Sequence, residues 1–103
     1  MKVIDNRKCF GFWAGMPTDE ITDSFEDFTK YKNTLPKDFI IQHIESLNAW
    51  ITSERSHDIF TGKAFNFGVY DDGDFTFPVD FLRYYKNYDI GIPPEYENHI
   101  KAL

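Results

Sequence analysis

Hydrophobic residues recur at helical spacing in the first half of the chain. Ile21, Phe25 and Phe28 lie three or four positions apart, which predicts an amphipathic helix from Thr18 to about residue 32. A longer stripe follows Pro36 and predicts a second helix, because proline fits the first turn of a helix. That stripe consists of Phe39, Ile40, Ile41, Ile44, Leu47, Trp50 and Ile51.

Alternating apolar and polar residues, typical of a strand, precede the segment Asp71-Asp72-Gly73. Phe65, Phe67 and Val69 alternate with smaller or polar neighbours, and an Asp-Gly pair suits a tight turn. A hairpin is therefore predicted near 64–77. Short strands are predicted at 1–5 and 9–13 with a turn at 6–8, and helices at 79–88 and after Pro93-Pro94.

This order of elements predicts an α+β fold, with a small antiparallel sheet that includes the hairpin near 64–77 and packs against two or three helices. A chain of 103 residues has the length of one domain, 1–103. Its folded surface should be roughly 6,000 Å². The hydrophobic share of 42% and the aromatic share of 18% favour a packed globule over a disordered acidic tail.

No cofactor, metal or catalytic site is predicted. His43, His57 and His99 lack metal-type spacing, and no serine has a nucleophile-elbow context. The run from Asp71 to Asp74 resembles a calcium loop only superficially, because Val79 stands where the bidentate glutamate of such a loop belongs. Cys9 is the only cysteine, which excludes an intramolecular disulfide. We expect a non-enzymatic protein.

Localisation is expected to be cytoplasmic. The sequence has no secretory signal pattern and no apolar run of the roughly 20 residues that span a bilayer. Membrane association is not expected.

Negative charge is concentrated in two stretches of the chain, whose formal net charge is −6. Asp19, Glu20, Asp23, Glu26 and Asp27 form the first stretch, without a basic residue among them. The second contains Asp71, Asp72, Asp74 and Asp80. Clustered carboxylates repel phosphate backbones, so a basic protein is a better partner than nucleic acid. Helix-end electrostatics, turn chemistry and a general role in solubility remain open alternatives.

Aromatic residues surround the second stretch in larger number than a short hairpin and helix can bury on one face. Tyrosine is enriched at protein interfaces, so some of these rings are expected to be exposed and to anchor a partner. The alternative is that the phenylalanines face inward and the tyrosines lie flat on the surface. The candidate contact residues are Asp19, Asp23, Glu26, Asp27, Tyr70, Asp71, Asp72, Asp74, Asp80, Tyr84, Tyr85 and Tyr88.

A short, acidic, aromatic-rich chain without catalytic residues, with the segment Phe77-Pro78-Val79-Asp80-Phe81-Leu82-Arg83-Tyr84-Tyr85 near its end, resembles the small immunity proteins of bacterial toxin systems. The resemblance is greatest to those that protect against contact-dependent growth inhibition toxins. It is one of type over the whole length and carries no specific motif. It implies a cognate toxin as partner, often a basic nuclease.

Two other functions fit the same sequence. The chain could serve as an adaptor or regulatory subunit, using the same surface for another partner. It could instead be a small ligand-binding protein or enzyme, with a pocket lined by Trp13, Trp50 and phenylalanines.

Overall fold

A hairpin of two short strands, β1 (Lys2–Ile4) and β2 (Arg7–Cys9), opens the computed structural model, which describes residues 1–103. Asp5 and Asn6 form its turn with φ of 51° and 64°, a conformation that Asp and Asn tolerate better than most residues. The predicted strand at 9–13 and turn at 6–8 are wrong. The pairing of β1 with β2 ends at Cys9, Phe10 still donates its N–H to the carbonyl of Thr76 in β5, and residues 11–13 leave the sheet and enter the core.

The sheet contains three further strands, β3 (Ala49–His57), β4 (Ala64–Asp72) and β5 (Phe75–Pro78), in the order β1-β2-β5-β4-β3. All neighbouring strands are antiparallel except β2 and β5. The predicted hairpin near 64–77 is confirmed, with a turn at Gly73 and Asp74 in which Gly73 has a φ of 58°. The predicted α+β fold class is confirmed.

The second predicted helix is right in its first half only. Helix α2 (Lys37–Glu45) buries Ile40 and Ile44, as its stripe predicts, but it ends at Glu45. Trp50 and Ile51 belong to strand β3, where their side chains are exposed. Their helical spacing from Ile44 is a coincidence, because they are not part of the core.

The first helix is shorter than the one predicted from Thr18 to about residue 32. Helix α1 (Phe25–Thr29) begins at Ser24, whose side chain accepts a hydrogen bond from the backbone N–H of Asp27 while the Asp27 carboxylate accepts one from the N–H of Ser24. The preceding residues are not helical and lie beside the 10–13 segment, since the N–H of Thr22 donates to the carbonyl of Phe12 at 2.9 Å. Thr18 is therefore not an N-cap.

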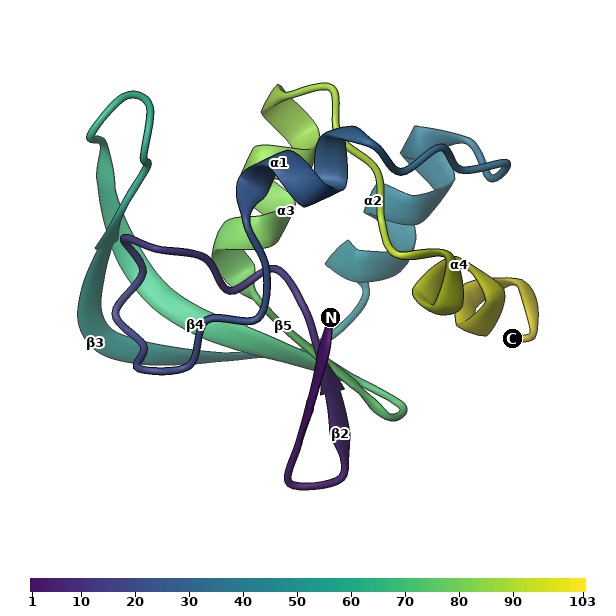
Figure 1. The fold of residues 1–103 in the computed structure, drawn as a ribbon, viewed down its shortest axis with the longest axis horizontal. Coiled ribbons are helices and arrows are strands. Elements are labelled where there is room, and N and C mark those ends of the chain that lie inside the picture. Colours follow the sequence, from purple (N-terminus) through teal and green to yellow (C-terminus); the bar gives the residue numbers. More distant parts are fainter.

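The last two helices, α3 (Val79–Asn87) and α4 (Pro94–Lys101), agree with the prediction. Pro94 lies in the first turn of α4, where a missing N–H costs no hydrogen bond. Figure 1 shows the four helices gathered on one side of the sheet, with β3 at its outer edge.

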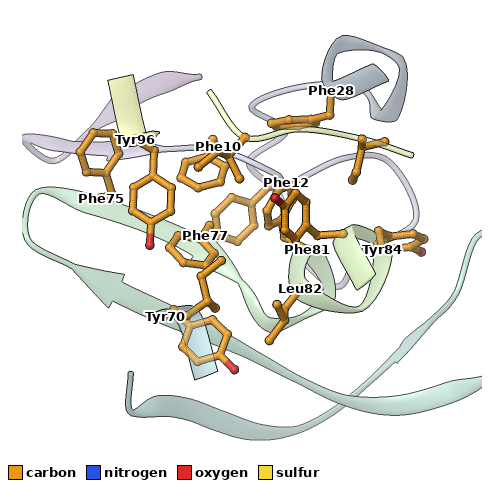
Figure 2. Close-up of a cluster of buried hydrophobic side chains, with 14 of the residues drawn as sticks. Phe10, Phe12, Phe28, Tyr70, Phe75, Phe77, Phe81, Leu82, Tyr84 and Tyr96 are labelled. Atoms are coloured by element: carbon orange, nitrogen blue, oxygen red, sulfur yellow. The ribbon is translucent and has the colours of Figure 1, made fainter. Parts of the chain in front are cut away.

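Aromatic rings fill the space between the sheet and the helices. Phe10 is fully buried, and its ring stacks on Phe77 with centroids 4.8 Å apart and meets Phe81 edge-on at 5.3 Å. Figure 2 shows Phe10 between Phe28 and Phe77, so that one ring from the irregular 10–13 segment joins the helix layer to the sheet. Offset and edge-on pairs of this kind add about 0.5–1.5 kcal/mol each beyond burial.

The size of the molecule agrees with its length. Its accessible surface is 5944 Å², close to the expected value, and its radius of gyration is 12.8 Å. No helix has the length and apolar character needed to cross a membrane.

Candidate functional site: an apolar patch flanked by carboxylates

The first acidic stretch is mostly exposed, as predicted. Asp19, Glu20, Glu26 and Asp27 are on the surface, with Glu20 3.6 Å from the ammonium of Lys2. Asp27 also caps helix α1. Its carboxylate accepts a hydrogen bond from the backbone N–H of Ser24, which lowers the pKa of Asp27. The Asp27 carboxylate therefore has a structural role besides any contact with a partner.

Asp23 is an exception within this stretch, because its carboxylate is buried. It accepts hydrogen bonds from the N–H of Gly11 at 2.9 Å and from the Thr22 hydroxyl at 2.7 Å, and it forms an ion pair with the amino group of Met1. These contacts tie the 17–23 segment to the start of the chain. The prediction of Asp23 as a surface contact is wrong.

The second acidic stretch is divided between surface and interior. Asp74 is exposed, and so is Asp71, which lies 3.3 Å from the guanidinium of Arg7 and accepts a hydrogen bond from Thr76. Asp72 and Asp80 are buried, so their prediction as surface contacts is wrong. In both cases the carboxylate has partners inside the fold.

Asp72 is the centre of a polar cluster that joins β4 to two helices. It accepts hydrogen bonds from Nε2 of His43 in α2 at 2.7 Å, from Nε2 of His99 in α4 at 3.0 Å and from the Tyr96 hydroxyl at 2.7 Å. Burial by itself would raise the pKa of Asp72, but these three donors outweigh it and lower the pKa below its ordinary value. The sequence spacing of these residues contains no signal for this cluster.

Asp80 lies in the first turn of α3 with no exposed surface. The Ser56 hydroxyl of β3 donates to its Oδ2, while Oδ1 has no hydrogen-bond partner. Burial raises the pKa of Asp80, and the Ser56 hydroxyl, the backbone N–H of Asp80 and the charge of Arg83 offset this only in part. Asp80 is therefore a structural link between β3 and α3.

The tyrosines are more deeply buried than predicted. Tyr70, Tyr84 and Tyr85 belong to the core, and Tyr88 is half-buried. Burial raises the pKa of Tyr85 to about 12. Figure 2 shows Tyr70 at the lower edge of the aromatic cluster and Tyr84 at its right-hand end. Trp13 and Phe25, from the 10–13 segment and α1, pack on Tyr84, whereas Tyr85 stacks on Phe81 and Tyr70 contacts Phe77. Tyr70, Tyr84 and Tyr85 are thus not surface anchors.

One group of apolar side chains reaches the surface beside the first acidic stretch. The exposed Ile21, Ile59 and Phe60 and the half-buried Phe25, here called the apolar patch, come from the 17–23 segment, the β3–β4 loop and helix α1. Phe60 is 54% exposed and contacts Phe25 edge-on with centroids 5.0 Å apart. Sequence reasoning missed Ile59 and Phe60 because no periodic pattern includes them.

A shallow hollow lies within the apolar patch. It has a volume of about 270 Å³, its walls are largely apolar, and Ile21, Phe25 and Ile59 lie around it with Trp13 at its base. Acidic residues flank the patch along the chain, since Asp19 and Glu20 precede Ile21 and Glu26 and Asp27 follow Phe25. An apolar centre with a polar rim is the usual anatomy of a protein interface.

The two tryptophans do not share a pocket. Trp50 lines a different hollow of about 620 Å³ with Leu47, Ala49 and Asp71, among others, at the start of β3. The pocket proposed for a small ligand between Trp13 and Trp50 is therefore absent. No three or more His, Cys, Asp or Glu side chains are grouped so as to hold a metal ion.

Comparisons with protein-family models, with curated proteins and with solved structures found no match to this chain.

Proposed function

We propose that this chain is a non-enzymatic immunity protein that binds and neutralises a cognate bacterial toxin, the best candidate being a basic nuclease domain. The observation that carries the proposal is the position of the apolar patch next to the exposed carboxylates Asp19, Glu20, Glu26 and Asp27. Asp19, Glu26 and Asp27 belong to the predicted contact set and remain on the surface, whereas Glu20 and the apolar patch are not part of that prediction.

The two parts of this surface have distinct effects on binding. Carboxylates attract a basic partner over long range and raise the association rate by roughly 10- to 1,000-fold at low salt, as a general magnitude. Phe25, Phe60 and Ile21 would be desolvated in the complex, which slows dissociation. A nuclease active site is positively charged because it holds phosphates, so an acidic inhibitor is complementary to it.

The proposal involves a smaller contact set than the sequence suggests. Asp19 and Glu26 supply charge without a structural partner, and Phe60 supplies exposed apolar surface. Tyr88 contacts Phe60 with centroids 4.8 Å apart and supports its ring. Asp71 and Asp74, exposed in the β4–β5 hairpin, are secondary candidates.

A rescue selection tests the proposal and identifies the toxin in the same experiment. Fragments of the source genome that stop growth of a bacterial host are isolated, and each is co-expressed with this protein. We expect restored growth for one fragment encoding a basic domain, and direct binding of the two purified proteins. If no growth-inhibiting fragment is rescued, the proposal is wrong.

Charge-reversal variants then locate the contact. The double variant Asp19→Lys/Glu26→Lys should lose protection and bind the rescued toxin at least about tenfold more weakly at low salt. The matched control Asp38→Lys/Glu95→Lys reverses the same number of exposed charges on helices α2 and α4, away from the patch, and should protect normally. Equal loss in both variants would indicate a net-charge effect and contradict the assigned surface.

A further inference from the structure

Strand β3 is an unpaired edge of the sheet. It pairs with β4 on one side only, and residues 50–55 are all exposed. Trp50 is 69% exposed and Ile51 55%. A long edge strand with exposed apolar side chains presents a row of unsatisfied N–H and C=O groups, which another extended segment can pair with.

Charge favours a second copy of this chain as that segment. The molecule as a whole has 17 acidic and 11 basic residues, so two copies repel each other over most of their surface. In β3, however, one acid, Glu54, is adjacent to one base, Arg55, and the strand has no formal net charge apart from His57. Two copies can meet along this edge without the general repulsion.

The shape of β3 is also compatible with itself. Its pairing with β4 is regular at 49–51 and again at 55–57, and irregular between Ile51 and Arg55. Two straight segments of equal length thus flank a central irregularity. A two-fold axis through that centre places the first segment of one copy beside the second segment of the other, which is the isologous contact of a symmetric dimer.

The orientation of the side chains selects the register. In β4, Gly68 and Asn66 are two positions apart and so lie on one face. Their partners in β3 are Ile51 and Arg55, which therefore share a face too. In an antiparallel pair, opposite residues share a face, which puts Ile51 opposite the other copy's Arg55 and the two Ser53 residues opposite each other.

We propose that two copies of this chain associate through antiparallel pairing of their β3 strands, with the two-fold axis at Ser53. The two sheets then form one continuous sheet. In this register Glu54 lies opposite the other copy's Thr52 and Arg55 opposite its Ile51, so no like charges are directly opposed. The pairing buries Trp50 and Ile51 and satisfies the edge.

Sedimentation of the unmodified protein tests the association. Over concentrations from about 1 µM to about 1 mM, we expect the mass to rise to twice that of the monomer. A monomer over this whole range overturns the proposal.

Disulfide trapping tests the register. In a Cys9→Ala background, the variant Ile51→Cys/Arg55→Cys should give a covalent dimer under oxidising conditions, because opposite residues have the Cα separation that a disulfide needs. The two cysteines cannot join within one copy, since four steps along a strand span roughly 13 Å.

The single variants Ile51→Cys and Arg55→Cys are the matched controls. Neither should be trapped alone, whereas an equal mixture of the two should be. Efficient trapping of either single variant would contradict this register. If the double variant fails to fold, the mixture of single variants still decides between the outcomes.

Discussion

Asp72 and His43 are joined by a hydrogen bond of 2.7 Å that links the end of β4 to helix α2. The same carboxylate accepts from Tyr96 and His99, so it also holds helix α4. Two helices that are far apart along the chain are therefore fixed to the sheet by one buried side chain.

Replacement of Asp72 by asparagine should destabilise the fold in a pH-dependent way. The asparagine amide cannot accept all three donors, so the free energy of unfolding at pH 7 should fall by about 1–3 kcal/mol. Because the folded pKa of Asp72 is lowered, its stabilisation is present above the unfolded pKa of about 3.8 and is lost as the pH falls through the folded pKa. Urea unfolding at several pH values measures this.

The control for that variant is Asp71→Asn. Asp71 is exposed and pairs with Arg7 on the surface, and such pairs contribute about 0–1 kcal/mol. Equal destabilisation in both variants, or a gap between Asp72→Asn and the unmodified protein that does not narrow at acid pH, would contradict the role of Asp72.

Gly73→Ala should lower the stability of the fold more than Gly62→Ala. Both glycines have positive φ, 58° and 73°, so an alanine at either position has a backbone cost of about 1–2 kcal/mol. At Gly73 the new Cβ would also lie 2.6 Å from Cε1 of His99, whereas at Gly62 it meets no atom within 4 Å. His99 must then move away from Asp72. Thermal unfolding of the two variants should show the difference, and equal melting temperatures would contradict the clash.

Asp80→Asn should stabilise the protein at neutral pH. The folded pKa of Asp80 is raised, mainly by burial, so the charged form is unfavourable in the folded state. With a raised pKa, the unmodified protein gains stability as the pH falls from the folded pKa toward the unfolded value of about 3.8, and the advantage of the variant should shrink over that range. Chemical denaturation at pH 7 and near pH 4 gives the comparison. A variant that is less stable at pH 7 would show that the charge itself supports the start of α3.

Phe10→Ala should be among the most destabilising single changes. Its ring is fully buried between sheet and helices, and loss of a buried phenylalanine costs about 3–5 kcal/mol. Phe39 in α2 is 52% exposed, so Phe39→Ala is a control with the same chemical change and an expected cost below about 1 kcal/mol. Similar costs at both positions would place Phe10 outside the core.

Sequence patterns predicted the parts of the fold that local chemistry determines. The β4–β5 hairpin follows from a glycine in a tight turn, and α3 and α4 each begin beside a proline. Helix α1 had a local signal as well, the capping pair of Ser24 and Asp27, but the spacing of Ile21 extended the predicted helix too far. Ile21 is exposed and does not belong to an apolar helix face.

The candidate site was harder to predict because burial depends on tertiary contacts. Asp23, Asp72 and Asp80 look like surface carboxylates in the sequence, and each is buried because its donors come from distant elements. Ile59 and Phe60 show the opposite error. They lie in a loop without periodicity, and only their position against Phe25 reveals the apolar patch.

The one parallel contact of the sheet has a consequence for the order of folding. Lys8 in β2 pairs with Phe75 in β5, so the first hairpin can join the sheet only after β5 has been synthesised. For the same reason, Phe10 can stack on Phe77 only late in synthesis. While the chain is being synthesised, the ring of Phe10 therefore stays without its partners Phe77 and Phe81 until the last third of the chain has left the ribosome.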